Sequence, residues 1–309
     1  MLPMSAQTGD RNAPVGQDQH IALCVNDVFW PPAFTVIRSI CLTATHREKL
    51  RFHLVVAGIP PMLVEDLRTL KQEFGVFIEV INVDEHDRFA ELVETLPTTK
   101  RFPPIIYARI FLAELLSKDI ERVLYLDADT LVLSPLDPLF SMPLGNMAAA
   151  AVTDPQAMRV ANGRDVRNNR DLFDPSQPYF NSGVLLIDLP AWRALDIAGK
   201  ISTLSTKGVL SRLYFDQDLL NLLLRGHWLE LDRLWNVTHP HDAHQILNPH
   251  ILHFTGSDKP WRLLSKAGYA RLYRHVMTND MFYRYWRQRA LVSILGDWAH
   301  RLTARHSDS

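Results

Sequence analysis

The chain has 309 residues, of which 47% are hydrophobic and 22% charged, and its formal net charge is −1. These values are typical of a globular protein with a sizeable core, and a nearly neutral chain has no overall field that would attract nucleic acid. Its two cysteines, Cys24 and Cys41, form no disulfide framework. No secretory signal and no apolar run of membrane-spanning length is present. We therefore expect a protein that binds no nucleic acid and that is cytoplasmic, either free or attached at the inner face of the cell membrane only through its surface.

Apolar residues predict an alternation of strands and helices along the chain. Short apolar runs predict strands at 21–25, 51–59, 76–83, 123–126, 130–133, 147–152, 180–189 and 251–254. Helical spacing predicts helices after Pro31, after Pro60, over 107–116, after Pro190 and over 216–225, and 135–140 is predicted to be a turn. This order predicts an α/β fold with a Rossmann-like, mostly parallel sheet that has helices on both faces.

Three segments differ in character from this alternating core. Residues 1–19 are polar and predict a disordered arm. Residues 154–178 predict a long polar loop, with or without a short helix, and a loop of this length usually has a function, such as covering a substrate. Residues 265–309 combine arginines with aromatic residues, which is typical either of peripheral membrane contact or of a helical cap that packs on the core. We therefore expect one catalytic domain over 20–264 and a C-terminal helical tail over 265–309.

Asp127-Ala128-Asp129 directly follows the predicted strand 123–126. Residues two apart in an extended chain point the same way, so both carboxylates can reach one cation. In open α/β sheets the ligand crevice lies at the carboxyl ends of the strands. Divalent cations held there by carboxylates usually complete their shell with substrate phosphates. By itself the pattern is weak, because Asp216-Gln217-Asp218 is a second instance, and a solvated strand end is the alternative.

His253 follows another apolar run and precedes Gly256 and Lys259. An imidazole near two carboxylates favours Mn²⁺ over Mg²⁺ as the ion. Gly256 permits close backbone approach, and Lys259 has the charge to face a diphosphate. The alternatives are a satisfied core histidine and a surface lysine in a turn.

Four further polar residues stand beside apolar segments. Arg109 is predicted in the first turn of a helix, where a cation opposes the helix dipole, which indicates a ligand or an ion pair. Asn181 lies at the edge of a buried strand, with Gly183 as a candidate bulge. Asp216 is a candidate helix N-cap, and Gln217 would then lie in the first turn.

Taken together, these segments resemble the retaining glycosyltransferases of family 8, which have the type-A nucleotide-sugar-binding fold. The nearest members are the bacterial lipopolysaccharide and lipooligosaccharide galactosyl- and glucosyltransferases. The resemblance covers about residues 20–262. The matching segments occur in the family's order: Ile21–Asn26, Tyr107-Ala108-Arg109, Tyr125-Leu126-Asp127-Ala128-Asp129, Phe180-Asn181-Ser182-Gly183-Val184-Leu185-Leu186, Asp216-Gln217-Asp218-Leu219-Leu220-Asn221, and His253 with Gly256 and Lys259-Pro260-Trp261.

The resemblance implies a role for each matching residue. The implied metal ligands for Mn²⁺, with Mg²⁺ as the alternative ion, are Asp127, Asp129 and His253. The nucleotide-sugar contacts it implies are Val25, Asn26, Asp27, Asp127 and Ala128 toward the nucleotide, Gly256 and Lys259 toward the diphosphate, and Arg109, Asn181, Asp216 and Gln217 toward the sugar. Asn26 stands where the family usually has an aspartate that reads uracil, and Asp27 follows it.

The implied reaction moves galactose or glucose from a UDP-sugar to a saccharide or glycolipid acceptor, in lipopolysaccharide or other surface-glycan synthesis. Gln217 and Asp216 are the implied catalytic residues. Gln217 is an amide and a poor nucleophile, so front-face attack is favoured over a covalent intermediate. The alternatives are a metal-dependent phosphotransferase or nucleotidyltransferase, which leaves the Asn181 and His253 segments unexplained, and an inactive sugar-binding homologue.

Overall fold

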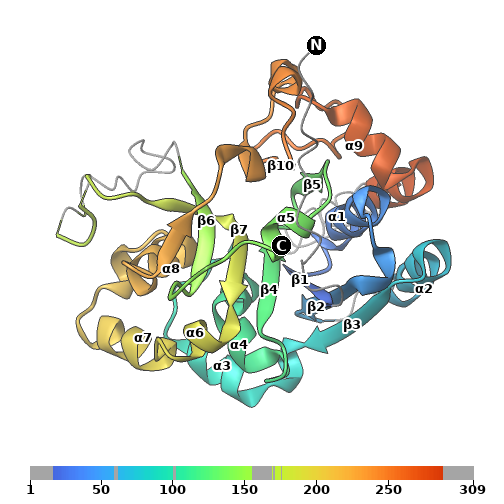
Figure 1. The fold of residues 1–309 in the computed structure, drawn as a ribbon. Helices are drawn as coiled ribbons and strands as arrows, with labels where there is room; N and C mark the ends of the chain where they lie inside the picture. Colours follow the sequence, from blue (N-terminus) through green and yellow to red (C-terminus); the bar gives the residue numbers. More distant parts are fainter. Residues whose placement is uncertain are drawn as a thin grey trace, which may run out of the picture.

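The structure, a computed structural model, describes residues 17–58, 62–99, 102–154, 169, 171–174 and 176–287. A seven-stranded sheet forms its centre, in the order β3-β2-β1-β4-β7-β6-β8 (Figure 1). Its strands are β1 (Gln19–Val25), β2 (Leu50–Val56), β3 (Phe77–Asn82), β4 (Arg122–Leu126), β6 (Ala149–Thr153), β7 (Phe180–Asp188) and β8 (Trp228–Glu230). Only β7 is antiparallel to its neighbours β4 and β6 within this sheet. The predicted mostly parallel sheet is confirmed.

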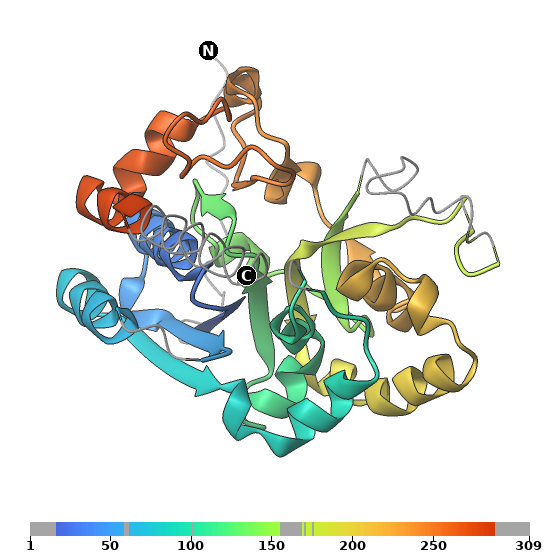
Figure 2. The ribbon, with the colours of Figure 1, turned by 180° about the vertical axis from the view of Figure 1, so that it is seen from behind.

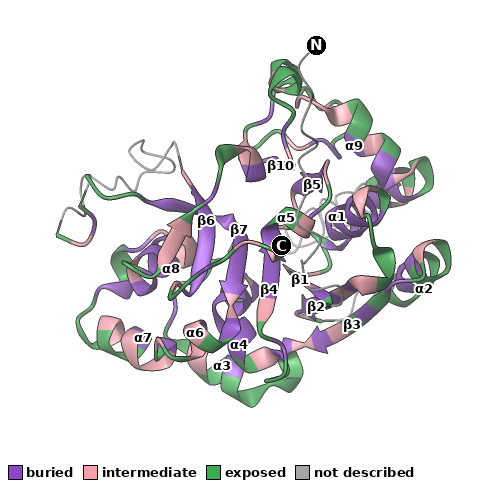
Figure 3. Cartoon of the chain, in the orientation of Figure 1, coloured by how far each residue is buried: buried purple, intermediate pink, exposed green. Residues whose placement is uncertain are grey.

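Helices cover both faces of the sheet, which is why its central strands β4, β6 and β7 are almost entirely buried (Figures 2 and 3). In β1, Ile21 and Leu23 belong to one core and the intervening Ala22 to the other. The first core also contains residues of α1 (Trp30–Thr43), α2 (Leu63–Phe74), α5 (Asp137–Phe140) and α9 (Ala270–Met277). The second contains residues of α3 (Asp87–Glu94), η3 (Pro104–Phe111), α4 (Leu112–Leu115), α6 (Leu189–Arg193), α7 (Ile197–Thr206) and α8 (Phe215–Leu223).

The helices begin and end at local signals in the sequence. Two prolines open α1, where their missing N–H groups have no helical partner to lose. Gly75 ends α2 in the left-handed conformation, with φ 67°. The helix predicted over 107–116 differs from the structure: a 3₁₀ helix, η3, begins at Pro104, and α4 continues it to Leu115. The predicted turn over 135–140 contains the short helix α5.

A second, three-stranded sheet lies at the carboxyl ends of β1 and β4 (Figure 1). Its order is β5-β10-β9, with β5 (Thr130–Val132), β10 (Ile251–His253) and β9 (Val237–Thr238). β5 follows β4 after only three residues, and His253 of β10 pairs with Thr130 across the antiparallel ladder. This pairing brings the histidine to the Asp127-Ala128-Asp129 turn although the two are far apart in the sequence. The short strands β8 and β9 were not predicted.

The described part of the C-terminal segment packs onto the core. α9 lies beside α1, and residues 279–287 form a further helical segment. Tyr273 and Phe282 are buried there, whereas Tyr283 and Trp286 are more than 40% exposed. Arg284 reaches Asp66 of α2, with 2.8 Å between Nη2 and Oδ1. Within residues 17–287, apart from the gaps given above, no helix is long and apolar enough to cross a membrane.

Three sequence predictions fall wholly or partly outside the described residues. These are residues 1–16 of the predicted arm, most of the predicted loop 154–178, and the tail beyond 287. β1 already begins at Gln19, inside the predicted arm.

Candidate active site

The backbone of the Asp127-Ala128-Asp129 turn is fixed by strands from both sheets. The Asp127 N–H donates to the Gly183 carbonyl of β7 at 2.8 Å. The Phe254 N–H, just beyond β10, donates to the Asp129 carbonyl at 2.9 Å. Thr130 Oγ1 donates to the Asp127 carbonyl at 2.9 Å. Because both ends of the turn are held, the two carboxylates are presented in a fixed arrangement.

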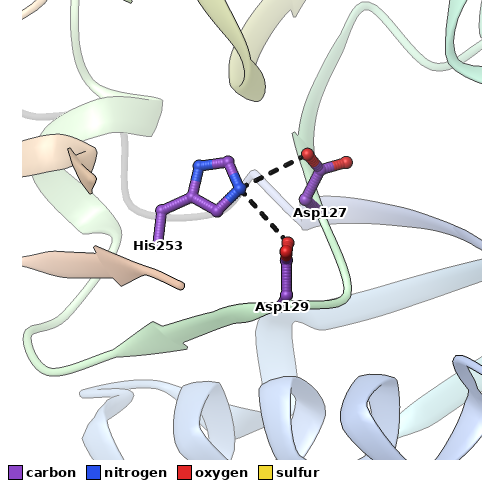
Figure 4. Close-up of side chains that lie close together, drawn as sticks. All are labelled: Asp127, Asp129 and His253. Atoms are coloured by element: carbon purple, nitrogen blue, oxygen red, sulfur yellow. Dashed lines mark ion pairs between the residues drawn. The ribbon is translucent and has the colours of Figure 1, made fainter. Parts of the chain in front are cut away.

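Each carboxylate of the pair has one oxygen occupied by a neighbouring side chain. Asp127 Oδ1 accepts a hydrogen bond from the Tyr125 hydroxyl at 2.6 Å and lies 2.8 Å from Arg109 Nη2. Asp129 Oδ2 lies 2.6 Å from Lys259 Nζ. The remaining oxygens, Asp127 Oδ2 and Asp129 Oδ1, point toward His253 (Figure 4).

His253 completes a three-residue cluster with the two aspartates. Its Nε2 lies 3.5 Å from Asp127 Oδ2 and 3.2 Å from Asp129 Oδ1, and the three ligand atoms lie within 4.8 Å of one another. Its other ring nitrogen, Nδ1, is 2.9 Å from Asn236 Oδ1. Two carboxylates and an imidazole fit a divalent transition-metal ion. The structure therefore brings together the three predicted metal ligands.

Electrostatics keep Asp129 in the form that a metal ligand needs. Burial raises the pKa of its carboxyl group, but the nearby His253 and Lys259 outweigh burial and hold the pKa below its usual range. Asp129 is therefore ionised at neutral pH. A ligand that is already deprotonated releases no proton when a cation binds.

Arg109 lies between two carboxylates. Its Nη1 is 3.2 Å from Asp216 Oδ2, and its Nη2 contacts Asp127. Burial lowers the pKa of the guanidinium, but the two carboxylates outweigh burial and raise it well above the ordinary value. The prediction that Arg109 begins a helix is wrong, because η3 begins at Pro104 and Arg109 lies in its last turn. Its position is explained by this double ion pair and not by the helix dipole.

Asp216 and Gln217 lie in the first turn of α8. Burial raises the pKa of Asp216, and Arg109 offsets this only in part. Gln217 Oε1 accepts from Asn181 Nδ2 at 3.3 Å, and its Nε2 donates to Asp154 Oδ2 at 3.0 Å. The prediction that Asp216 is the N-cap is wrong, because Tyr214 occupies that position. The amide of Gln217 thereby joins α8 to β7 beside Arg109.

The predicted nucleotide contacts lie at the same sheet edge as the acidic turn. Ala22 pairs with Tyr125 in the parallel ladder, so β1 ends at Val25 on the same edge of the sheet at which β4 ends at Leu126. Asn26 and Asp27 follow β1, and their side chains accept hydrogen bonds from backbone N–H groups of the next turn. No hydrogen bond is described between these two side chains and Asp127 or Asp129.

Gly256 follows β10 with φ 87°, a conformation that favours glycine. A Cβ atom built on it would lie 3.1 Å from His239 Cε1. Glycine at this position of the loop that leads from His253 to Lys259 therefore leaves room for the ring of His239.

Two further residues at this site were missed as ligand-supporting groups in the sequence. A Cβ atom on Gly183 would lie 2.1 Å from His253 Cε1 and 2.7 Å from Asp127 Oδ2, so only glycine leaves room for the cluster. A glycine inside an apolar strand signals such close approach. Asn236 is a buried amide between Trp235 and Val237. A lone polar residue between apolar ones was the available signal.

Comparison with known proteins places this site in a family. The model for "Glycosyl transferase family 8" matches residues 20–264. A lipopolysaccharide 1,2-glucosyltransferase of Escherichia coli K12 is 31% identical over 259 residues, which are 79% of this chain and 73% of that protein. General stress protein A of Bacillus subtilis is 27% identical over 84% of this chain and 93% of its own length.

A solved structure shows the same fold. The galactosyltransferase LgtC, crystallised with donor and acceptor sugar analogs, superposes with a TM-score of 0.69. It is 24% identical and covers 84% of this chain and 95% of its own. With the family model spanning most of the sequence, the chain belongs to glycosyltransferase family 8 and is a glycosyltransferase with the type-A fold.

Proposed function

We propose that this hexosyltransferase moves galactose or glucose from a UDP-sugar to a saccharide acceptor with retention of the anomeric configuration, and that it depends on Mn²⁺. The observation that carries the proposal is the convergence of Asp127 Oδ2, Asp129 Oδ1 and His253 Nε2, with Arg109 bridging the cluster to Asp216. The names of the glucosyltransferase and galactosyltransferase relatives support the choice of sugar. No similar observation favours phosphotransfer.

The donor would lie along the edge of the sheet. Its nucleotide would contact Val25, Asn26, Asp27 and Ala128, and its diphosphate would contact the cation, Gly256 and Lys259. Its sugar would contact Arg109, Asn181, Asp216 and Gln217. A cation held by Asp127, Asp129 and His253 would neutralise the charge that develops on the departing UDP. Lys259 lies against Asp129 and can add a second positive charge there.

Retention is proposed to proceed by front-face attack. Among the proposed sugar contacts, the residue with a carboxylate that could act as nucleophile is Asp216. That carboxylate is ion-paired with Arg109 and lies 3.4 Å from Ser182 Oγ, so it is placed to orient sugar hydroxyls and not to attack. Gln217 is an amide whose oxygen accepts from Asn181 Nδ2 and from the Ser182 N–H. The acceptor hydroxyl would instead pass its proton to a leaving phosphate oxygen. Covalent glycosyl–enzyme trapped on Asp216 would overturn this mechanism.

The acceptor is proposed to be a glycolipid or saccharide of the cell surface, such as a lipopolysaccharide core. The protein would then work in the cytoplasm, with peripheral contact at the inner face of the membrane. Exposed Tyr283, Trp286 and Arg287 are the described tail residues available for that contact. Replacing Trp286 by Ser should lower flotation with anionic liposomes, and unchanged flotation would remove this contact from the proposal.

Donor hydrolysis tests the proposed reaction directly. The purified chain would be incubated with UDP-galactose, UDP-glucose and other UDP-sugars, with Mn²⁺ or with a chelator, and UDP release measured. We expect release from UDP-galactose or UDP-glucose with Mn²⁺ and its loss with the chelator. No release from any donor would sink the proposal and favour an inactive homologue. Release of phosphate or pyrophosphate without sugar transfer would point to the phosphotransferase alternative.

A further inference from the structure

A series of hydrogen-bonded side chains, three of them amides, runs from the metal cluster to the residues proposed to hold the sugar. It starts at His253 and passes through Asn236, Asn181 and Gln217 to Asp154. Each step is a hydrogen bond of 2.9 to 3.3 Å. The first three of these residues are at least 93% buried, so water does not compete for their hydrogen bonds.

Backbone N–H groups fix the direction of every hydrogen bond in this series of side chains. The Gly183 N–H donates to Asn181 Oδ1 at 3.0 Å, so that atom is an acceptor and the Asn181 amide nitrogen must donate to Gln217 Oε1. The Ser182 N–H also donates to Gln217 Oε1, at 3.3 Å, which gives the same orientation independently. Gln217 Nε2 is then free to donate to the Asp154 carboxylate.

The same reasoning fixes the orientation of Asn236. Because Asn181 Oδ1 is an acceptor, the atom of Asn236 that lies 2.9 Å from it is the donor nitrogen, Nδ2. The other atom of the Asn236 amide, Oδ1, can only accept, and it lies 2.9 Å from His253 Nδ1. His253 must therefore carry a proton on Nδ1. The lone pair of a neutral imidazole is then on Nε2, the atom that faces Asp127 and Asp129.

The local fold holds Asn236 in this position. It lies between η6 (Arg233–Trp235) and β9, and β9 pairs in parallel with β10, which carries His253. Its own N–H donates to the Arg233 carbonyl. The side chain is therefore set by the same small sheet that brings the histidine to the acidic turn.

We propose that Asn236 is a positioning residue that selects the metal-binding tautomer of His253 and couples the metal cluster to the sugar-binding amides. The proposal rests on the proposed function, because it takes Mn²⁺ as the ion and Asn181 and Gln217 as sugar contacts. Outer partners of this kind orient a metal-ligating histidine, and their loss lowers metal affinity by about 10–100-fold.

Two substitutions of Asn236 separate its two hydrogen bonds. Asn236→Leu keeps the branched shape of the side chain and removes both. Asn236→Asp keeps an acceptor for His253 Nδ1 and removes the donor to Asn181. We expect Asn236→Leu to weaken Mn²⁺ binding about 10–100-fold, and Asn236→Asp to retain Mn²⁺ binding while weakening the binding of the intact UDP-sugar relative to UDP.

Binding of Mn²⁺ to the full chain is measured in the presence of saturating UDP. The electron paramagnetic resonance signal of free Mn²⁺ reports how much of the ion remains unbound. Electron spin-echo modulation from a coordinated imidazole nitrogen gives a second readout, which should weaken in Asn236→Leu. The matched control is Asn221→Leu, since Asn221 is also buried but, among the residues that the structure describes, its side chain bonds only to backbone atoms of Phe180 and Gln217. We expect the control to lose thermal stability and keep its Mn²⁺ affinity.

The outcomes distinguish this inference from the proposed function. If the wild-type chain with UDP binds no Mn²⁺, the proposed metal dependence fails. If the wild type binds Mn²⁺ and Asn236→Leu binds it equally well with unchanged nitrogen modulation, Asn236 is not a positioning residue. Equal losses of affinity in Asn236→Leu and Asn221→Leu would also overturn the inference, because the effect would then be a general loss of structure.

Discussion

The chain contains two Asp-x-Asp segments next to the same cluster, and they use their aspartates differently. In Asp127-Ala128-Asp129 both carboxylates face His253. In Asp216-Gln217-Asp218 only Asp216 faces the cluster, through Arg109. Asp218 accepts hydrogen bonds from the Tyr179 hydroxyl and the Tyr214 N–H, both at 2.6 Å, and these bonds fix the start of α8.

Backbone conformation explains this difference. The first segment is the turn between β4 and β5, in which the Thr130 N–H donates to the Asp127 carbonyl at 3.2 Å, whereas residues two apart in a helix are about 200° apart around the axis. The first segment leaves a strand and the second opens a helix. Identical spacing therefore gives a pair of cation ligands in one case and one site residue plus one structural residue in the other.

The largest expected effect comes from breaking the first pair. Asp129→Ala removes a carboxylate that faces His253, so we expect transfer activity to fall by at least about 10³-fold, the size of a lost metal contribution. The fold should remain, because the backbone of the turn is held by β7 and β10. Activity is measured as UDP release and folding by circular dichroism.

Asp119→Ala is the matched control for this substitution. Asp119 is exposed and precedes β4, at the opposite end from the acidic turn. The control should retain activity. If Asp129→Ala kept full Mn²⁺-dependent activity, Asp127-Ala128-Asp129 would not be a metal site.

A second prediction concerns Gly183, which lies against Asp127 and His253. In Gly183→Ala the new methyl group would occupy the position of the His253 ring. We expect the histidine to be displaced and Mn²⁺-dependent activity to fall about 10²-fold, with a stability cost of about 1–3 kcal/mol from overpacking. The affinity for Mn²⁺ should fall in parallel with activity. A Gly183→Ala enzyme with normal Mn²⁺ affinity would show that the ring has room to move.

Sequence patterns predicted the sheet and the strand-end acidic pair because these depend on local spacing. The partners of the pair depend on long-range contacts. Arg109 was placed at the start of a helix, and its actual role, between Asp127 and Asp216, needed the packing of η3 against β4 and α8. Asn236 lies in a short connection without periodicity. Its contact with His253 depends on β9 pairing, which two residues of strand cannot signal.

A third prediction concerns Asp218, the aspartate of the second segment that has a structural role. Asp218→Ala removes the hydrogen bonds that its carboxylate accepts from Tyr179 and Tyr214 at the start of α8, and this should cost about 1–3 kcal/mol of the free energy of unfolding. Activity per folded molecule should change far less than in Asp129→Ala. Urea unfolding and UDP release measured on the same preparation separate the two effects. A loss of activity as deep as that of Asp129→Ala, without a loss of stability, would place Asp218 in the reaction.

The smallest expected effect is a difference in how Asp216 and Asp129 make the stability of the protein depend on pH. Asp216 has a raised pKa in the folded chain, mainly through burial. Between its unfolded value of about 3.9 and the higher folded value, the native state binds more protons than the unfolded state. Its contribution to stability therefore decreases as pH rises through that window. Asp129 has a lowered pKa, so its contribution is present above the unfolded value and is lost as pH falls through the folded value.

The two substitutions Asp216→Asn and Asp129→Asn should therefore shift stability in opposite directions. Relative to the wild type, Asp216→Asn should gain stability as pH rises above about 3.9, whereas Asp129→Asn should lose stability as pH rises toward about 3.9, where the contribution of Asp129 becomes complete. The measurement is urea unfolding of the three chains without metal across the acid range. Parallel curves for Asp216→Asn and the wild type would mean that Arg109 fully compensates the burial of Asp216. Burial would then destabilise the ionised form of Asp216 no more than that of Asp129, and the two segments would not differ in their electrostatics.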